Sequence, residues 1–347
     1  MPLRPKVAEA LHQLYLAKGV LATTAIEGNT LSEEQVLKHL QGELHLPPSQ
    51  QYLEQEIANI VKACNRIGRS IENTDGSLTP EEICRFNARV LYKLPLDADI
   101  APGRFRAREV VVGNIYRGAP AEDCPYLIEK LCEWLRGPDF AGSAGVETVY
   151  AIIKAVIAHL YLAWIHPFDD GNGRTSRLVE FYLLLHAGIP FPAAHLLSNH
   201  YNVTRTEYYR QLKNASASGG NILPFVEYAV GGLVDGLKEQ VARIRLQQWD
   251  VTWRNYVHEE FRDKITKIGK RRRDLLLELS ENETLISKIF DLSPRLARLY
   301  ATKSLRTLLR DLAELEKLGL VERKEGNVRA RKEIILAFLA KRKEAKR

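Results

Sequence analysis

One twelve-residue stretch, HPFDDGNGRTSR at 166–177, restricts the fold of this chain more than any other part of the sequence. Apolar residues recur at helical spacing before it, in 147–165. A second helical pattern, SRLVEFYLLLHAGI, leaves it and ends near Gly188 and Pro190. The stretch is therefore a polar loop that leads into the first turn of a helix. It is either a simple connection or a place where a ligand is held.

Helix signals continue through most of the chain. Ser32 is an expected N-cap with Gln35 at the capping-box position. Thr79 is another, followed by Pro80 at the first helical position and Glu82 at the capping-box position. Strand signals are scarce, and the clearest is a run of three valines at 110–112 that predicts a short hairpin. The patterns together predict an all-α fold with one short β-hairpin.

Composition indicates a globular protein, with 45% hydrophobic and 27% charged residues, and 347 residues suggest two or three domains. The apolar stretch 155–165 is too short and too interrupted to span a bilayer, so we expect no membrane segment. The N-terminus lacks the apolar core of a signal peptide. We therefore expect a cytoplasmic protein whose cysteines are reduced and form no CxxC pair: Cys64, Cys84, Cys124 and Cys132.

The positive charge lies in the C-terminal quarter. Residues 264–347 contain 23 Lys/Arg and 12 Asp/Glu, whereas residues 1–263 contain 27 and 31. A basic segment of this kind binds nucleic acid electrostatically. The alternative is a set of solvated helix faces that ends in a Lys/Arg tail.

The Gly-Asn-Gly part of the loop suits a phosphate. Gly171 and Gly173 let the backbone curl its N–H groups around an anion at a helix N-terminus. Arg174 and Arg177 are three residues apart and project from one helix face. Two planar guanidinium groups beside such a nest suit a di- or triphosphate.

Neighbouring residues add a metal ligand and a base. Asp169 or Asp170 can hold Mg²⁺ against phosphate oxygens, and His166 can accept a proton from an attacking hydroxyl. The alternative is an ordinary polar turn with a capping histidine. The sequence has no Walker P-loop. A zinc site built from His159, His166 and Asp170 is disfavoured, because the two histidines are seven residues apart without a metal motif.

The whole stretch resembles the signature of the Fic (Fido) family, HPFx(D/E)GNGRxxR, at every defined position. The resemblance implies an all-helical core and transfer of AMP from ATP to a protein hydroxyl. It gives His166 the role of general base, Phe168 that of a loop anchor, Asp170 that of Mg²⁺ ligand and Arg177 that of γ-phosphate ligand. The residues it assigns to the nucleotide are Gly171, Asn172, Gly173, Arg174, Thr175, Ser176 and Arg177.

A second motif, TTAIEGN at 23–29, resembles the inhibitory motif of the family, (S/T)xxxE(G/N), with Thr23, Glu27 and Gly28. The resemblance implies that Glu27 pairs with Arg177, which then cannot orient the γ-phosphate. The alternative is a helix C-terminus that ends in Glu-Gly-Asn.

Two further segments resemble the family less specifically. The segment 101–114 resembles the flap that holds the target by strand addition, which would bring its tip near the nucleotide: Val110, Val111, Val112 and Gly113. Tyr208 and Tyr209 would lie near adenine, although two tyrosines on a helix are also typical of a core. Ser216 stands where some relatives have Asn. The resemblance extends over roughly residues 1–235.

Residues 302–331 resemble a winged helix-turn-helix. A leucine stripe predicts one apolar helix face: Leu305, Leu308, Leu309, Leu312, Leu315 and Leu318. Gly319 closes the helix, and LVERKEGNVRAR follows as strand, turn, strand. The residues that would face DNA are Lys303, Arg306 and Arg310. The alternative is a protein-docking or dimer module.

We therefore predict four regions: a helical region with the inhibitory motif at 1–95, a Fic core at 96–235, a connecting helix at 236–265 and a winged-helix-like domain at 266–347. The predicted function is Mg²⁺- and ATP-dependent protein adenylylation inhibited by Glu27, with removal of AMP as a second activity. The expected partners are a target protein, DNA and a second copy of the chain. The alternatives are a DNA-binding regulator that senses nucleotide and a Fic enzyme that transfers another phosphate-containing group.

Overall fold

The structure is a computed structural model that describes residues 5–73, 76–112, 116–142 and 144–338. It is mainly helical, as the sequence predicts. The chain divides into two compact units, residues 2–241 and 242–347. Each unit has its own hydrophobic core. The predicted connecting helix, 236–265, falls largely within a longer helix that begins at Leu223.

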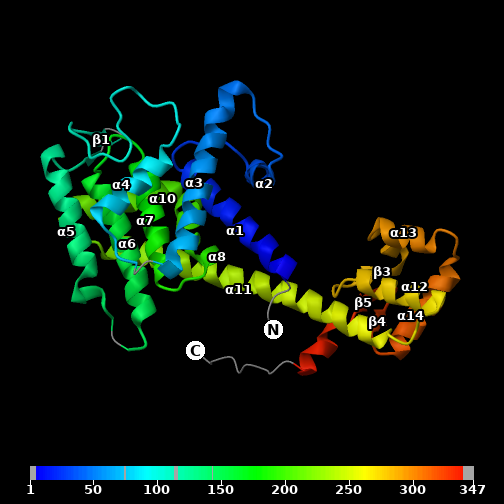
Figure 1. Cartoon of the computed structure of the whole chain (residues 1–347). Helices are drawn as coiled ribbons and strands as arrows, with labels where there is room; N and C mark the ends of the chain where they lie inside the picture. The colour runs from blue at the N-terminus through cyan, green and yellow to red at the C-terminus, as the bar shows by residue number, and fades with distance from the viewer. Residues whose placement is uncertain (1–4, 74–75, 113–115, 143, 339–347) are drawn as a thin grey trace. The chain divides into compact units, whose positions relative to one another are not determined.

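Helices build almost all of the first unit. Helices α6 and α7 pack side by side, α5 packs on α6, and α1, α3 and α4 pack on α7 (Figure 1). The helices are α1 (Pro5–Ala25), α2 (Glu33–Gln41), α3 (Gln51–Ser70), α4 (Pro80–Val90), α5 (Cys124–Arg136), α6 (Glu147–Ile165), α7 (Asn172–His186), α8 (Phe191–Ala194), α9 (Leu196–Val203), α10 (Arg205–Ala217) and α11 (Leu223–Glu260), of which residues 223–241 belong to this unit.

The predicted helix starts are confirmed. The Ser32 hydroxyl accepts from the Gln35 backbone, and the Gln35 side chain accepts from the Ser32 backbone, which completes a capping box at α2. The Thr79 hydroxyl accepts from the Glu82 backbone at 3.2 Å, so α4 begins at Pro80. These caps depend only on residues three apart, and local sequence therefore determines them.

The predicted hairpin is present but short. Strands β1 (Val111–Val112) and β2 (Tyr116–Arg117) pair antiparallel, with Val111 opposite Arg117. Gly113, which we predicted to lie near the nucleotide, is outside the described residues. The backbone N–H of Gly118 donates to the Val110 carbonyl at 3.3 Å and extends the pairing by one bond.

Helix α6 is longer than the apolar stretch seen in the sequence. It has 19 residues, an 18-residue window of which has a mean hydropathy of 1.7, and it is long and apolar enough to cross a membrane by length and composition alone. The expectation that this region is too short to span a bilayer is therefore wrong on length. The helix packs between α5 and α7, and its central His159 is fully buried and bonded to the Tyr208 hydroxyl at 2.9 Å. These contacts are those of a core helix.

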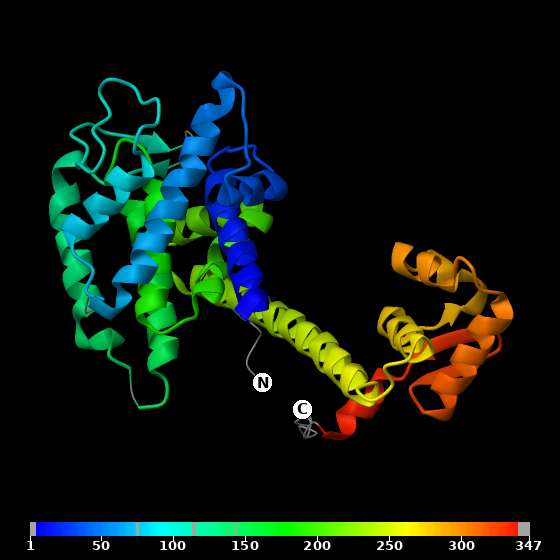
Figure 2. The same ribbon diagram turned by 45° about the vertical axis from the view of Figure 1, so that its right-hand side comes forward.

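The second unit alternates helices with a small antiparallel sheet of strand order β3-β5-β4. Figure 2 shows this sheet beside α12 and α14. Val321 of β4 pairs with Ala330 of β5, which confirms the predicted strand, turn, strand. The elements in chain order are α12 (Lys267–Glu278), β3 (Thr284–Leu285), α13 (Pro294–Tyr300), α14 (Leu305–Lys317), β4 (Val321–Lys324) and β5 (Asn327–Ala330).

The predicted leucine stripe of α14 is wrong in width. Leu308, Leu312 and Leu315 are fully buried and form the packed face. The other three leucines are exposed by 38% or more: Leu305, Leu309 and Leu318. Leu308, Leu312 and Leu315 are spaced i, i+4 and i+7 and therefore lie on one side of the helix. The three exposed leucines lie at the edges of that face.

Candidate active site

The loop between α6 and α7 has a defined backbone shape. His166 ends α6 in the left-handed conformation, with φ 50°, and its N–H donates to the Leu162 carbonyl. Gly171 precedes α7, also with positive φ, at 77°. A residue with a side chain adopts this region at a cost, which explains glycine at the second position. The two left-handed residues turn the chain from one helix into the next within six residues.

Two aromatic and amide contacts fix the loop to the core. The Asn172 side chain accepts from the Phe168 N–H at 2.9 Å and donates to the Phe168 carbonyl at 2.7 Å. The Phe168 ring is 1% exposed and stacks on Phe105 at 5.7 Å between ring centroids. Asn172 therefore shapes the loop with its side chain, and Phe168 anchors it as the resemblance implied.

Arg106 holds the same loop from the flap side. Its guanidinium is 3% exposed and donates to backbone carbonyls of the loop and the hairpin, among them His166 at 2.7 Å. Further acceptors are the carbonyls of Arg108, Ala119 and Ile165. A buried guanidinium must find acceptors for its fork of donors, so Arg106 binds the end of α6 and the base of the hairpin together.

Asn87 of α4 holds the other end of the loop. Its side-chain N–H donates to the Asp170 carbonyl at 2.9 Å and to the Thr175 hydroxyl at 3.3 Å. Its carbonyl oxygen accepts from the Gly103 N–H at 2.9 Å. Asn87 is 1% exposed, so these bonds are shielded from water.

An anionic side chain lies at the N-terminus of α7. No side-chain cap satisfies this helix start. The Glu27 carboxylate lies directly against Gly173, so close that a Cβ at this glycine would overlap its Oε1. The helix N-terminus carries partial positive charge and favours an anion there. A carboxylate of the same chain thus lies beside the predicted nest.

Arg177 binds that carboxylate and the end of α1. Its Nη2 donates to Glu27 Oε1 at 2.5 Å, and its Nε donates to the Thr23 hydroxyl at 2.8 Å. The Nη2 also donates to the Thr23 carbonyl at 3.0 Å. The Arg177 side chain is 1% exposed, whereas that of Glu27 is 31% exposed. The motif residues predicted from sequence, 150 positions apart, are therefore in direct contact.

Charge decides the protonation of this pair. Burial raises the pKa of Glu27, but the Arg177 charge and hydrogen bond, with Arg174 and His166, lower the pKa below its usual value. The carboxylate is therefore ionised at neutral pH. Gly28, with φ 105°, follows it and completes the turn after α1.

Arg174 is bound by two other acids. One terminal nitrogen contacts Glu56 of α3, and the other lies 3.3 Å from Asp170 Oδ1. The Asp170 side chain remains 40% exposed. Asp169, the alternative metal ligand, is 10% exposed and bonded to Arg108 at 2.8 Å. The geometry therefore favours Asp170 as the acid open to a metal.

His166 has the protonation state of a base. Burial lowers the pKa of its imidazole, and the charge of Arg106 acts in the same direction. A hydrogen bond to the Ala163 backbone and the acids Glu27 and Asp170 oppose this shift without reversing it. The ring is therefore neutral at pH 7 and able to accept a proton.

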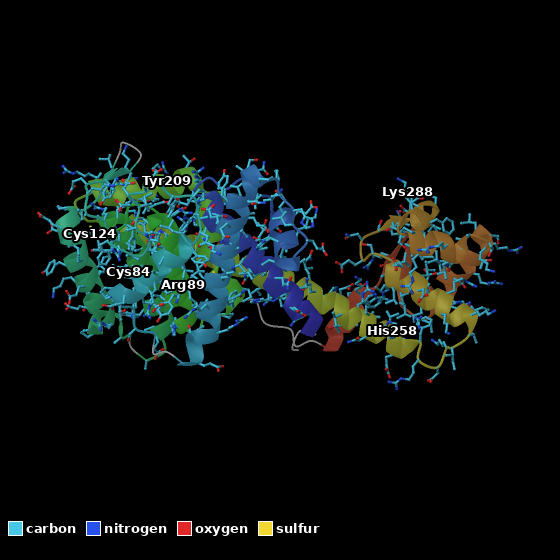
Figure 3. All side chains as sticks on the ribbon, turned by 45° about the horizontal axis from the view of Figure 1, so that its top comes forward. Cys84, Arg89, Cys124, Tyr209, His258 and Lys288 are labelled. Atoms are coloured by element: carbon cyan, nitrogen blue, oxygen red, sulfur yellow. The ribbon has the colours of Figure 1, made fainter. Side chains whose placement is uncertain are left out.

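The two tyrosines predicted to lie near adenine differ in exposure. Tyr208 is 2% exposed, stacked on Tyr201 and bonded to His159, so its ring belongs to the core and offers no face to a purine. Tyr209 is 44% exposed, at the surface in Figure 3, and its hydroxyl lies 3.4 Å from the Ile26 carbonyl.

The helix residues after the nest face inward. The Ser176 hydroxyl donates to the Asn172 carbonyl, and the Thr175 N–H donates to the Gly171 carbonyl. Both residues are buried, and their assignment to the nucleotide stays a prediction. Of the flap, Val111 is 60% exposed.

The sequence reasoning missed three residues of the site: Asn87, Arg106 and Glu56. Apart from the bond of Arg106 to the Arg108 carbonyl, the contacts described above join each of them to partners between 13 and 118 positions away, many of them backbone carbonyls. No spacing rule within one helix or loop reveals such contacts. For Asn87 and Glu56 the available signal was a polar residue in an otherwise apolar helix face; Arg106 lies in a loop and gave no such signal.

Among the described residues, no group of three or more His, Cys, Asp or Glu side chains has the arrangement of a metal site. Mg²⁺ does not require one, because it is commonly held by one or two carboxylates together with phosphate oxygens and water. Asp170 fits that role. The four cysteines are free thiols, among them Cys84 and Cys124 in Figure 3.

Comparison with known proteins points to one family. Residues 77–184 match the Fic/DOC family. The chain is 28% identical over 229 residues to "Protein adenylyltransferase Fic" of Nematostella vectensis, covering 66% of this chain and 48% of that protein. It is 32% identical over 211 residues to "Protein adenylyltransferase fic-1" of Caenorhabditis elegans, covering 60% and 38%. The chain thus spans about half, or less, of the length of these curated relatives.

A solved structure shares the fold. The crystal structure of a Fic family protein from Desulfovibrio desulfuricans G20 superposes with a TM-score of 0.56 at 22% identity. The match covers 94% of this chain and 88% of the other.

Proposed function

We propose that this chain, in which residues 77–184 are a Fic/DOC family domain, is a protein adenylyltransferase that transfers AMP from ATP to a hydroxyl of a target protein. One observation carries the proposal: the α7 N-terminus already holds an anion, the Glu27 carboxylate, between Gly173 and Arg177. A site that binds a carboxylate in this way also suits the outer phosphates of a nucleotide.

Each step of the proposed transfer has a described group to carry it. His166 accepts the proton of the target hydroxyl, whose oxygen then attacks the α-phosphorus of ATP. The bond between the α-phosphorus and the bridging oxygen breaks, and pyrophosphate leaves. The α7 N–H groups and Arg177 stabilise the charge that develops on the phosphates. No covalent enzyme intermediate is required.

Asp170 would hold Mg²⁺, which when bound neutralises phosphate charge. Arg106 and Asn87 act on the protein side by keeping the loop in shape. Val111 of the exposed hairpin is available for strand addition by a target segment.

Glu27 is the proposed inhibitor of the same site. While it binds Arg177, the γ-phosphate finds neither the guanidinium nor the helix N-terminus. ATP that binds in this state has its α-phosphate displaced from His166. The same carboxylate can align a water against an AMP-modified hydroxyl, and we include AMP removal in the proposal. Release of AMP from a modified target by the wild type, but not by Glu27→Gly, tests that part.

The main experiment compares Glu27→Gly with the double variant Glu27→Gly/His166→Ala. Each variant is incubated with ATP, Mg²⁺ and a cell extract as the source of target, and the intact mass of the modified protein is measured. The single variant should add AMP, and the double variant should add about 10²–10⁴-fold less AMP. Equal labelling by both variants would contradict the role of His166. Parallel incubations with other nucleotides test transfer of a different group.

A second candidate function concerns the second unit. Helices α13 and α14 are followed by the β4–β5 hairpin, an order that fits a winged helix-turn-helix. Lys303, Arg306 and Arg310 are exposed at the start of α14, which favours contact with DNA phosphates. The exposed Leu305 and Leu309 on the same helix favour the alternative, a protein-docking surface.

A further inference from the structure

We propose that Glu56 of α3 is a positioning residue that couples the inhibitory turn to Arg174, so that the two arginines of the site are restrained together. The proposal rests on the proposed adenylyl transfer, and Glu56 itself lies outside both sequence motifs. Glu56 is 8% exposed and lies between the turn after α1 and the N-terminal part of α7.

The two carboxylate oxygens of Glu56 have different partners. Oε1 contacts Nη1 of Arg174. Oε2 accepts from the Asn29 side chain at 2.8 Å. One carboxylate therefore joins a residue of the proposed phosphate site to a residue two positions after Glu27.

Asn29 fixes the inhibitory turn on α3. Besides its bond to Glu56, its Nδ2 donates to the Leu53 carbonyl at 3.0 Å, and its Oδ1 accepts from the Leu31 N–H at 3.1 Å. Asn29 is 6% exposed, so water does not compete for these bonds. Gly28 alone separates it from Glu27, and its left-handed backbone defines the turn. Holding Asn29 therefore holds Glu27 against Arg177.

Arg174 depends on Glu56 for its place. Its bond to Asp170 is long, at 3.3 Å. Among the described residues no acceptor lies within hydrogen-bond distance of its Nε, which is buried. Asp170 is also the residue proposed to hold Mg²⁺. When Mg²⁺ engages Asp170, Glu56 remains as the carboxylate that keeps Arg174 from the phosphates.

Glu56 therefore couples the contact between Glu27 and Arg177 to its own contact with Arg174. If Arg174 turns to a phosphate, Glu56 loses a partner, and the anchor of Asn29 weakens. If the turn leaves, Glu56 and Arg174 are free to move apart. Replacing Glu56 by Gln breaks this arrangement with little change in volume. A Gln amide has one carbonyl oxygen, so it accepts from one of the two donors and presents its N–H₂ to the other.

The experiment places Glu56→Gln and Asn29→Ala in the wild type and in Glu27→Gly. In the wild type, we expect each to raise AMP transfer about tenfold, the size of a lost buried bond to a charged group. In Glu27→Gly, Asn29→Ala should change neither the rate of AMP transfer nor the Kd of Mg·ATP, because the contact between Glu27 and Arg177 is already absent. Glu56→Gln should still lower the Kd of Mg·ATP several-fold there, because it removes a negative charge and frees Arg174.

Matched controls separate release from loss of stability. Glu54→Gln removes a carboxylate of the same helix that is bonded to His39 and lies outside the site. Asn59→Ala removes a buried amide of α3 that donates to the carbonyls of Val90 and Tyr92. Both controls should leave transfer within about twofold of their parent, even where thermal unfolding shows that Asn59→Ala is less stable.

Hydrogen exchange of residues 24–31 supplies a readout independent of activity. Asn29→Ala and Glu56→Gln should both accelerate it, and Glu54→Gln should not. Unchanged exchange and transfer in the first two variants would overturn the coupling. Weaker Mg·ATP binding in Glu27→Gly/Glu56→Gln would also overturn it, since Glu56 would then orient Arg174 toward the phosphates. If Glu27→Gly itself neither binds ATP nor transfers AMP, the proposed function fails, while the exchange result still decides the coupling.

Discussion

Each of the two units pairs arginine with an acid, but the two clusters differ in which partner is buried and in where the acid comes from. In the second unit, Asp311 is fully buried and accepts from Arg271 at 2.6 Å, Arg272 at 3.0 Å and the Tyr300 hydroxyl at 3.0 Å. All four residues lie in α12, α13 and α14. In the first unit, Arg177 finds its acid on the turn after α1, and that acid is 31% exposed.

This difference separates a structural cluster from an exchangeable one. Asp311 is not open to an incoming ligand, and the second acid beside Arg272, Glu314, is 38% exposed. Glu27 is partly open to solvent and stands at a helix N-terminus that also suits phosphate. A buried pair is weak evidence for stability or function by itself, and its accessibility decides which of the two it serves.

The largest expected effect comes from breaking the structural cluster. Asp311→Asn leaves two arginines against a neutral amide, which should cost the second unit about 3–5 kcal/mol of its free energy of unfolding. Chemical denaturation monitored by hydrogen exchange of 267–330 measures this. Glu322→Gln, which removes a half-exposed partner of Arg329, is the control and should cost less than about 1 kcal/mol. Similar losses for both variants would contradict the comparison.

The next effect tests the loop clamp of the first unit. Arg106→Gln removes the guanidinium that binds the carbonyls of Ile165, His166 and Ala119. In Glu27→Gly, AMP transfer should fall about 10²-fold, because the base shifts relative to the phosphorus. The Kd of Mg·ATP should change much less. Arg104 is an exposed arginine of the same segment, and Arg104→Gln should leave AMP transfer and the Kd of Mg·ATP as they are in Glu27→Gly. Equal loss of binding and rate would speak for a direct phosphate contact instead.

A smaller effect follows from pH. Because the pKa of His166 is lowered by burial, its neutral form persists below the usual value of 6.5. Transfer by Glu27→Gly should be level between about pH 7 and 8 and fall tenfold per unit only below the lowered pKa. Removal of Glu27 also removes an acid that raises this pKa, so the fall moves further down. A fall beginning above pH 6.5 in the rate of transfer would contradict the assignment.

The inhibitory pair should not respond to pH in that range. The pKa of Glu27 is lowered, so its contact with Arg177 is fully present above the unfolded value of 4.5 and is lost only as pH falls through the lower folded value. Wild-type transfer should therefore stay repressed from about pH 6 to 8, measured beside Glu27→Gly in the same buffers. Activation of the wild type near pH 6 would show that another group controls the contact.

The smallest effect concerns the surface of the second unit. If Lys303, Arg306 and Arg310 contact DNA phosphates, each change to Gln should make the negative slope of log K against log salt less steep by about 0.9. Lys288, exposed on the same unit in Figure 3, is the control for general charge. Binding that is insensitive to salt, or that depends on Leu305 and Leu309, would favour protein docking.

The sequence predicted what is local or carried by a motif. The caps at Ser32 and Thr79, the hairpin and the helix–loop–helix frame depend on neighbours within a few positions. The pairing of Glu27 with Arg177 was predicted from a family resemblance rather than from spacing, because 150 positions separate the residues.

The remainder depends on tertiary contacts that no local pattern contains. In the sequence, Arg106 is one arginine among several in a polar segment, and its role depends on backbone carbonyls that only the folded chain brings to it. Tyr208 and Tyr209 are adjacent, yet one is buried and the other exposed, since successive helix residues point about 100° apart. The same geometry leaves Leu305 and Leu309 outside the packed face of α14.

The position of Glu27 against Gly173 affects how nucleotide binding depends on the concentration of the protein. A competitor tethered to the same chain keeps its effective concentration however far the protein is diluted. In the proposed mechanism the triphosphate would therefore have to outcompete a carboxylate that is always present, and its apparent affinity would scale with the fraction of molecules in which the carboxylate has left. Changes in protein concentration leave this fraction untouched, whereas any contact that favours the departed turn raises the apparent affinity for nucleotide in direct proportion.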